Sequence, residues 1–207
     1  VTTVNVDTVR LKVLRVPDRI MARLAPEEFD EKRMRPWRVQ EVLQDTGALV
    51  WEGTMPVKGG QNETVTTAFP IRDAVKPWKP GAYLVVAWNA ADGKIDDNNE
   101  DNNFNYRYET ASQWVVDSDT GLTVLTGSDG LHVFARSLAS AKPLANTTLT
   151  LIARNNEELG RVVTDAQGYG LFAPGLTRGT GGNMPVAVMA YGANNREVGN
   201  PSWMSGS

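Results

Sequence analysis

The feature that most constrains the fold is an apolar side chain at every second position. Residues 8–14, TVRLKVL, alternate Val9, Leu11 and Val13 with Arg10 and Lys12. This period places the apolar side chains on one face of an extended strand. Other short segments show the same alternation or consist of a short apolar run, and they predict further strands. These segments are 37–44, 49–57, 63–69, 82–88, 105–116, 121–127, 130–137, 147–154, 159–165, 169–174 and 184–191.

Turn residues separate these segments at intervals of about ten positions, as in antiparallel sandwiches. In the second half they are Ser128 to Gly130, Lys142-Pro143, Asn155-Asn156, Asp165 to Gly168 and Gly179 to Asn183. The one segment with a helical start, 26–34, predicts one or two turns of helix. A length of 207 residues suits two domains. We therefore expect an all-β chain of two consecutive antiparallel β-sandwiches, residues 1–117 and 118–199, with 200–207 as a tail.

Composition excludes several classes of protein. The net charge is −3 and the basic residues are scattered, so nucleic acid is not an expected partner. The absence of cysteine excludes disulfides, thiolate nucleophiles and cysteine-ligated zinc within this chain. The apolar runs are too short to cross a membrane. We expect no cofactor.

Asp165 lies in VVTDAQGYGLF, Val162 to Phe172, between two apolar runs. Aspartate accepts hydrogen bonds from backbone amides in turns, and glycine at position 168 tolerates a positive φ. We therefore expect a hairpin turn, with a weak ion site as the alternative.

His132 is the only histidine. It could formally serve a Ser-His-Asp triad, but its place in the middle of GLHVFARS favours a strand-face side chain. A single histidine without cysteine also argues against structural zinc. We predict no catalytic residue, so the chain is not expected to be an enzyme.

A long acidic loop offers the one candidate metal site. Calcium takes six to eight oxygen ligands, which this loop could supply, but the spacing is not that of an EF-hand. A solvated loop is the preferred interpretation. The candidate ligands are Asp92, Asp96, Asp97, Glu100 and Asp101.

Several stretches carry a family resemblance: ASQWVVDSDTGLTVL (111–125), SDGLHVFARSLASAKPL (128–144), IARNNEELG (152–160) and PGLTRGTGG (174–182). Together they resemble the N-terminal part of bacterial alpha-2-macroglobulins, where macroglobulin-like domains of immunoglobulin or fibronectin type follow each other. The resemblance implies a non-catalytic scaffold within a periplasmic, lipid-anchored protein that traps and inhibits proteases. Its implied partners are other domains of that protein, target proteases and a penicillin-binding protein. The thioester of many members needs a cysteine, which this chain lacks.

The segment NNREVGNPSWMSGS (194–207) departs from the family pattern, because it is too polar to complete a sandwich. The second domain is thus expected to lack its last strand, and the exposed edge could pair two copies of the chain. An immunoglobulin-like adhesin or cell-surface binding module is the alternative function. An accessory domain that binds carbohydrate is a weaker third one.

Overall fold

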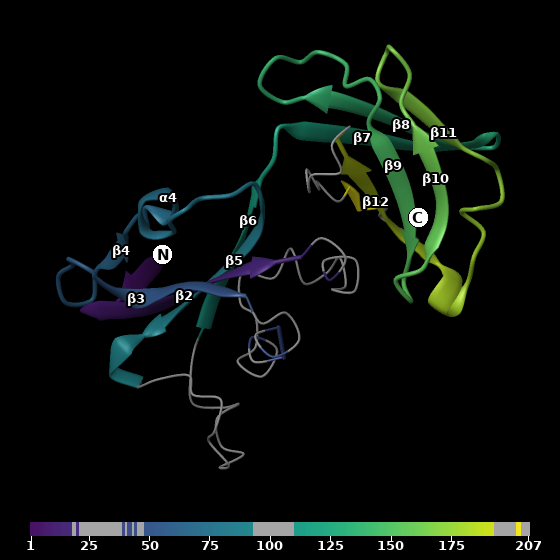
Figure 1. Ribbon diagram of the computed structural model, residues 1–207. Helices are drawn as coiled ribbons and strands as arrows, with labels where there is room; N and C mark the ends of the chain where they lie inside the picture. Colours follow the sequence, from purple (N-terminus) through teal and green to yellow (C-terminus); the bar gives the residue numbers. More distant parts are fainter. Residues whose placement is uncertain are drawn as a thin grey trace. The chain divides into compact units, whose positions relative to one another are not determined.

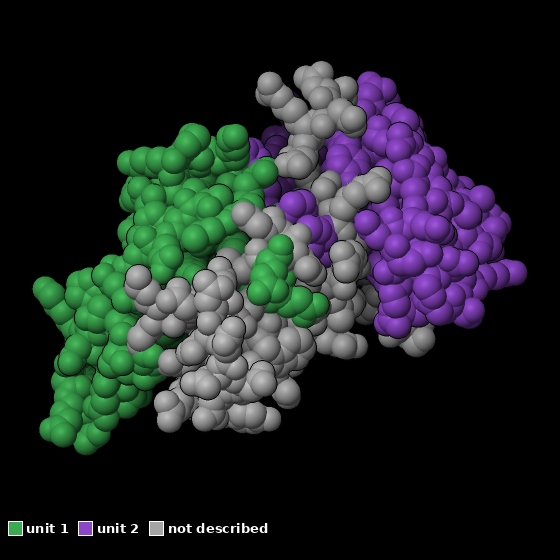
Figure 2. Space-filling model, turned by 60° about the horizontal axis from the view of Figure 1, so that its bottom comes forward, with its two compact units in different colours: residues 1–16, 27–79, 83–115 green, residues 17–26, 80–82, 116–207 purple. Residues whose placement is uncertain are grey.

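The protein divides into two compact units in a computed structural model (Figures 1 and 2). Unit 1 contains residues 1–16, 27–79 and 83–115, and unit 2 contains 17–26, 80–82 and 116–207. The sequence predicts a domain boundary after residue 117. The division into these two units does not test that boundary, which stays a prediction. The structure describes residues 1–17, 20, 39, 41, 42, 44, 48–92, 110–192, 202 and 203.

Unit 1 is built on a four-stranded sheet with the order β3-β2-β5-β6. Its strands are β2 (Thr8–Val16), β3 (Leu49–Pro56), β5 (Gly81–Asn89) and β6 (Thr110–Asp117). A smaller antiparallel sheet joins β1 (Thr2–Val4) to β4 (Thr64–Thr66). A short helix α4 (Ile71–Ala74) precedes β5, and a 3-10 turn η1 (Ala90–Asp92) follows it.

Both faces of the β2-β5 pair are buried, which explains the continuous apolar run in β5. On one face, Val9, Leu11 and Ala87 pack with Val57 and with Val65 of β4. The buried side chains of the other face include Leu14, Leu84, Val86 and Trp88, and Val39 and Val42 are buried as well.

Unit 2 is an antiparallel sandwich of two sheets. One sheet has the order β11-β8-β7, from β7 (Thr120–Gly127), β8 (Gly130–Ser137) and β11 (Tyr169–Phe172). The other has the order β10-β9-β12-β13, from β9 (Thr148–Ala153), β10 (Glu158–Val163), β12 (Pro185–Tyr191) and β13 (Ser202–Trp203). A 3-10 turn η2 (Gly181–Asn183) leads into β12.

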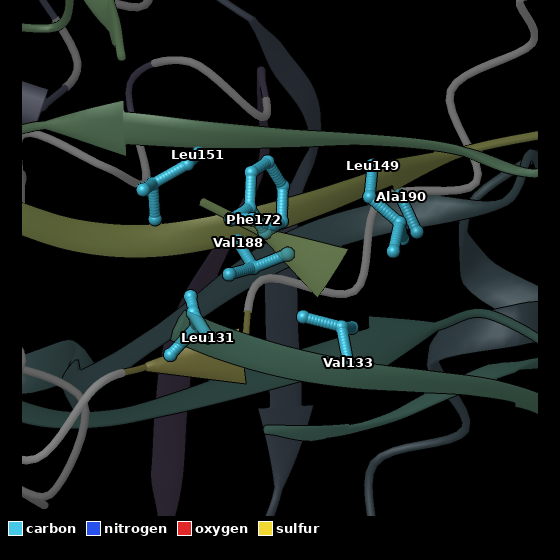
Figure 3. Close-up of a cluster of buried hydrophobic side chains, with 7 residues drawn as sticks. All are labelled: Leu131, Val133, Leu149, Leu151, Phe172, Val188 and Ala190. Atoms are coloured by element: carbon cyan, nitrogen blue, oxygen red, sulfur yellow. The ribbon is translucent and has the colours of Figure 1, made fainter. Parts of the chain in front are cut away.

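The core of unit 2 fills the space between these sheets (Figure 3). Every second residue of each strand points inward, so both sheets contribute one apolar face each. None of the seven side chains is exposed to solvent: Leu131, Val133, Leu149, Leu151, Phe172, Val188 and Ala190.

The predicted fold class is confirmed, because the described chain is dominated by antiparallel sheets. The predicted strand at 37–44 is wrong, since residues 39, 41, 42 and 44 are helical. Val39 and Val42 are both buried, and a spacing of three fits one face of a helix. The predicted helix at 26–34 lies outside the described residues.

The end of unit 2 differs from expectation. The sequence predicts no strand in 200–207, yet Ser202 and Trp203 pair with Val188 and Ala187 of β12. The last strand is therefore present as a short segment, and β12 is not the edge of its sheet at these positions.

Candidate functional site

The outer face of the β11-β8-β7 sheet carries the most distinctive group of side chains in unit 2. Strand register sets the side chains in rows across the sheet, because paired residues point to the same face. His132 pairs with Leu125 on one side and Leu171 on the other. Phe134 likewise lies between Thr123 and Tyr169.

Much of this face is apolar and reaches solvent. Leu125 is 55% exposed and Leu171 is 40% exposed, although each lies on a regular strand. Phe134 and Tyr169 are half-buried, and their ring centroids lie 5.2 Å apart. The outer face of an antiparallel sandwich is usually polar, so this surface is a candidate interaction site.

His132 is held from both sides within this face. Its Nδ1 lies 2.9 Å from the hydroxyl of Tyr169, and its Nε2 lies 3.0 Å from Oδ1 of Asp129. Asp129 belongs to the β7-β8 turn, so three segments converge on one imidazole. The predicted strand-face position of His132 is confirmed, whereas the sequence did not indicate its two partners.

The geometry does not support the triad considered for His132. In such a triad one ring nitrogen faces the aspartate and the other faces the serine hydroxyl whose proton it accepts. The nitrogens of His132 face Asp129 and the hydroxyl of Tyr169, so a tyrosine occupies the place that the triad needs for serine. This arrangement orients the ring and ties the turn to β11.

The same contact predicts a pH dependence of stability. Hydrogen bonds hold the pKa of Asp129 below its usual 3.8. The largest contribution comes from the hydrogen bond with His132, and the next comes from a backbone hydrogen bond. A carboxylate whose pKa is lowered by folding stabilises the fold at pH values above its pKa in the unfolded state. This contribution is lost as the pH falls through its pKa in the folded state. We expect Asp129→Asn to flatten the decline of unfolding free energy below about pH 4.

Urea unfolding at a series of pH values measures this slope. The control is the same substitution in a His132→Phe background, where Asp129 has lost its main partner. An equal flattening in both backgrounds would contradict the assignment of the effect to this contact.

The predicted turn at Asp165 is confirmed, but the predicted hairpin is wrong, because β10 pairs with β9 whereas β11 pairs with β8 in the other sheet. Its Oδ1 accepts hydrogen bonds from the amides of Gln167 at 2.8 Å and Tyr169 at 2.9 Å. Gly168 has a φ of +73° and donates its amide to the carbonyl of Asp165. The carboxylate thus completes the turn between β10 and β11.

The calcium candidates lie largely outside the described residues, which include Asp92 but not Asp96, Asp97, Glu100 or Asp101. Asp92 is half-buried and lines a cavity of about 600 Å³ in unit 1, beside β1 and the adjoining ends of β5 and β6. Within the described residues no cluster of three or more metal-ligating side chains occurs. The calcium hypothesis therefore stays untested.

Trp78 packs at the edge of a buried cluster in unit 1. Its ring stacks on Tyr83 with centroids 4.2 Å apart, and Arg72 lies 5.7 Å above it. This buried cluster contains Val13 and Val75. Its aromatic surface is therefore partly used within unit 1.

Comparison with known families places both halves of the chain. Residues 1–104 match the model of the bacterial alpha-2 macroglobulin MG2 domain. Residues 117–201 match that of the bacterial alpha-2-macroglobulin MG3 domain. The chain belongs to the bacterial alpha-2-macroglobulins. The family predicted from the sequence is thereby confirmed, and the β11-β8-β7 face lies within the MG3 match.

Solved alpha-2-macroglobulins share this fold. A crystal structure of the native Escherichia coli protein spanning domains NIE-MG1 has 20% identity and a TM-score of 0.69, covering 99% of this chain and 86% of that one. The trypsin-activated Escherichia coli protein has 20% identity and a TM-score of 0.64, covering 98% and 12%. A Salmonella alpha-2-macroglobulin mutant has 19% identity and a TM-score of 0.53, covering 91% and 10%.

The chain thus spans about a tenth of these two longer alpha-2-macroglobulins. No curated protein matches its sequence at a significant level. Among the described residues, no helix has the length and apolar character needed to cross a membrane.

Proposed function

We propose that this chain is a non-catalytic scaffold segment of a bacterial alpha-2-macroglobulin that traps and inhibits proteases. The observation that carries the proposal is the match of its two halves to two consecutively numbered domains of that family. Two consecutive β-rich units with apolar cores are suited to holding other parts of a large protein in place. The same match favours this role over the adhesin alternative.

The local chemistry is consistent with a scaffold. Asp165 completes a turn, and the imidazole of His132 is engaged on both nitrogens. Trp78 stacks within unit 1. These polar and aromatic groups make contacts within their own unit and stabilise its fold. Trapping would therefore depend on other domains of the parent.

The test compares the full-length parent with residues 1–207 alone. Each is mixed with trypsin, and trypsin activity is measured on a protein substrate and on a small peptide. We expect the parent to suppress cleavage of the protein substrate and to spare the peptide, because a trap encloses the protease without blocking its active site. Residues 1–207 alone are expected to leave both activities unchanged.

A parent that leaves cleavage of the protein substrate unaffected would contradict the trapping role. Suppression of both activities by residues 1–207 alone would contradict the scaffold role, since the segment would then be an inhibitor itself.

Location and anchorage are part of the proposal. We place the parent in the periplasm, lipid-anchored to the inner membrane, with a penicillin-binding protein as a partner. The complete reading frame and cell fractionation test this. A lipoprotein signal with its cysteine and recovery with inner membranes are expected, and recovery in the cytosol would contradict it.

A further inference from the structure

We propose that β7 is a docking edge, to which an extended segment of the parent protein outside residues 1–207 adds as a further strand of the β11-β8-β7 sheet. The source of this segment rests on the proposed scaffold role, which makes the chain one part of a longer protein. The inference goes beyond that role, because it assigns a contact to one strand. It also differs from the pairing of two copies expected from the sequence.

Strand β7 lies at one edge of its sheet. Among the residues that the structure describes, it pairs with β8 alone. The pairing is continuous, from Thr120 opposite Ser137 to Gly127 opposite Gly130, without a shift of register. A long regular edge strand offers a row of backbone N–H and C=O groups to an added strand.

Most edge strands carry a feature that prevents such pairing, namely charges, a proline, a bulge or a short length. The other edge strands described in unit 2 have one. The edge of β10 carries the ion pair of Arg161 and Glu158, with N and O 2.7 Å apart, and its register shifts between Glu158 and Gly160. Strands β11 and β13 have four and two residues. The sequence of β7, TGLTVLTG, has eight residues without a charge or a proline.

The backbone contacts of β8 show which groups of β7 point to the docking edge. Successive residues of an antiparallel strand direct their N–H and C=O groups alternately to its two sides. Ala135 of β8 donates its amide to the carbonyl of Gly168 and accepts a hydrogen bond from the amide of Leu144. The odd-numbered residues of β8 therefore turn their backbone groups away from β7, and the even-numbered ones turn them toward it.

The register then fixes the same alternation in β7. The even-numbered residues of β8 lie opposite the odd-numbered residues of β7, so Thr123 and Leu125 bond to β8. The N–H and C=O groups of Leu122, Val124 and Thr126 consequently point to the docking edge. A strand that adds there can pair with all three residues.

The side chains of β7 are also incompletely covered. Leu122 and Val124 pack against the core of unit 2, yet both are only half-buried. Leu125, on the outer face, is 55% exposed. An added strand would cover these side chains and pair the backbone groups at the same time. Apolar burial and hydrogen bonding thus favour the same position.

These surroundings define the chemistry of the added strand. Its inward side chains come to lie beside Leu122 and Val124, so apolar residues fit there. Its outward side chains lie beside Thr123 and Leu125, where β-branched and hydroxyl-bearing residues fit. The chain spans about a tenth of the two longer alpha-2-macroglobulins described above, so a parent of that length has ample chain outside residues 1–207 to supply the strand.

Hydrogen exchange at single amides, compared between residues 1–207 and the full-length parent, tests the proposal. In residues 1–207 we expect fast exchange at Leu122, Val124 and Thr126. In the parent, exchange at these three amides should slow by about a hundredfold or more, because the added strand accepts their hydrogen bonds. The internal control is the pair Thr123 and Leu125, whose amides bond to β8 and should be protected in both proteins.

Thr126→Pro tests the strand pairing itself. It removes one N–H donor from the docking edge, while the hydrogen bonds between β7 and β8 remain, because proline is tolerated where the N–H points away from the neighbouring strand. In the parent we expect this variant to return the exchange of Leu122 and Val124 to the rates of residues 1–207. Near-UV circular dichroism verifies that the variant is folded.

The matched control is Val163→Pro in β10. Thr164 donates its amide to the carbonyl of Thr147, so the amide of the adjacent Val163 points away from β9. Val163 is exposed, as Thr126 is. This variant makes the same kind of change at the edge of the other sheet, and it should leave the protection of β7 in the parent unchanged.

Equal exchange at the three edge amides in the parent and in residues 1–207 would overturn the proposal. Slow exchange in residues 1–207 alone would overturn it as well, because the edge would then be covered within this chain. Protection that survives Thr126→Pro, with folding intact, would show that another surface covers β7 without adding a strand.

These outcomes are separate from those of the trypsin test. A parent that traps trypsin but leaves the edge amides fast would contradict only the docking edge. A parent that protects the edge amides without trapping trypsin would contradict only the trapping role.

Discussion

Gly168→Ala is expected to lower the free energy of unfolding of unit 2 by about 3 kcal/mol or more. Gly168 is buried and has a φ of +73°, a conformation that costs alanine about 1–2 kcal/mol. An added Cβ would also collide with the carbonyl oxygen of Ala135 and lie 3.0 Å from the amide nitrogen of Leu144. That carbonyl accepts a hydrogen bond from the Leu144 amide, so the added methyl group would disrupt this hydrogen bond.

Gly181→Ala is the matched control. Gly181 has a φ of +60°, but an added Cβ there has no neighbour within 4 Å. It therefore isolates the conformational cost, about 1–2 kcal/mol. Urea unfolding with hydrogen exchange at the β8 amides gives both values. Equal losses in the two variants would show that the collision at Gly168 is relieved cheaply.

The turns of unit 2 could be predicted from sequence because their signals are local, although the turn at Asp165 joins strands of two sheets and not the two strands of a hairpin. The turn at Asp165 uses an aspartate whose acceptor reaches amides two and four residues ahead. The alternation around it fixes the inward face of β11, where Phe172 is buried and Leu171 is exposed. The turn chemistry and the burial pattern there both depend on residues that are close in the sequence. The sequence alone is therefore sufficient to predict the turn.

The two incorrect predictions, the strand at 37–44 and the missing last strand, have a physical cause as well. Residues 37–44 alternate enough to suggest a strand, yet Val39 and Val42 also fit a helical face, and a short apolar pattern does not separate the two. Ser202 and Trp203 pair with β12 through backbone contacts that leave no periodic signal in two residues.

The candidate site was predictable only in part. The sequence places His132 on a strand face, and the spacing of Asp129 and His132 across a turn is visible in it. Which side chains flank that histidine depends on the register with Leu125 and Leu171. Because register between distant strands is set by the whole sandwich, the apolar rows appear only once the strands are paired.

Leu149→Ala is expected to lower the free energy of unfolding of unit 2 by about 3 kcal/mol. Leu149 is completely buried in the cluster between the two sheets (Figure 3). Truncation removes apolar contacts and leaves a cavity that β9 and β12 cannot close without shifting, since Leu149 pairs with Ala190. The bare backbone of Gly170 lies beside its side chain and offers no atoms to fill the gap.

Leu138→Ala makes the identical chemical change at a leucine that is 65% exposed, and it should cost about 0.5 kcal/mol or less. Urea unfolding of the two variants at one protein concentration gives the comparison. The ratio of the two losses tests the enclosure of Leu149, because of the two leucines only the buried one leaves a cavity on truncation. Similar losses at both positions would mean that Leu149 is not enclosed by both sheets. A large loss at Leu149 alone would show that the two sheets close on one core, which the proposed scaffold role requires.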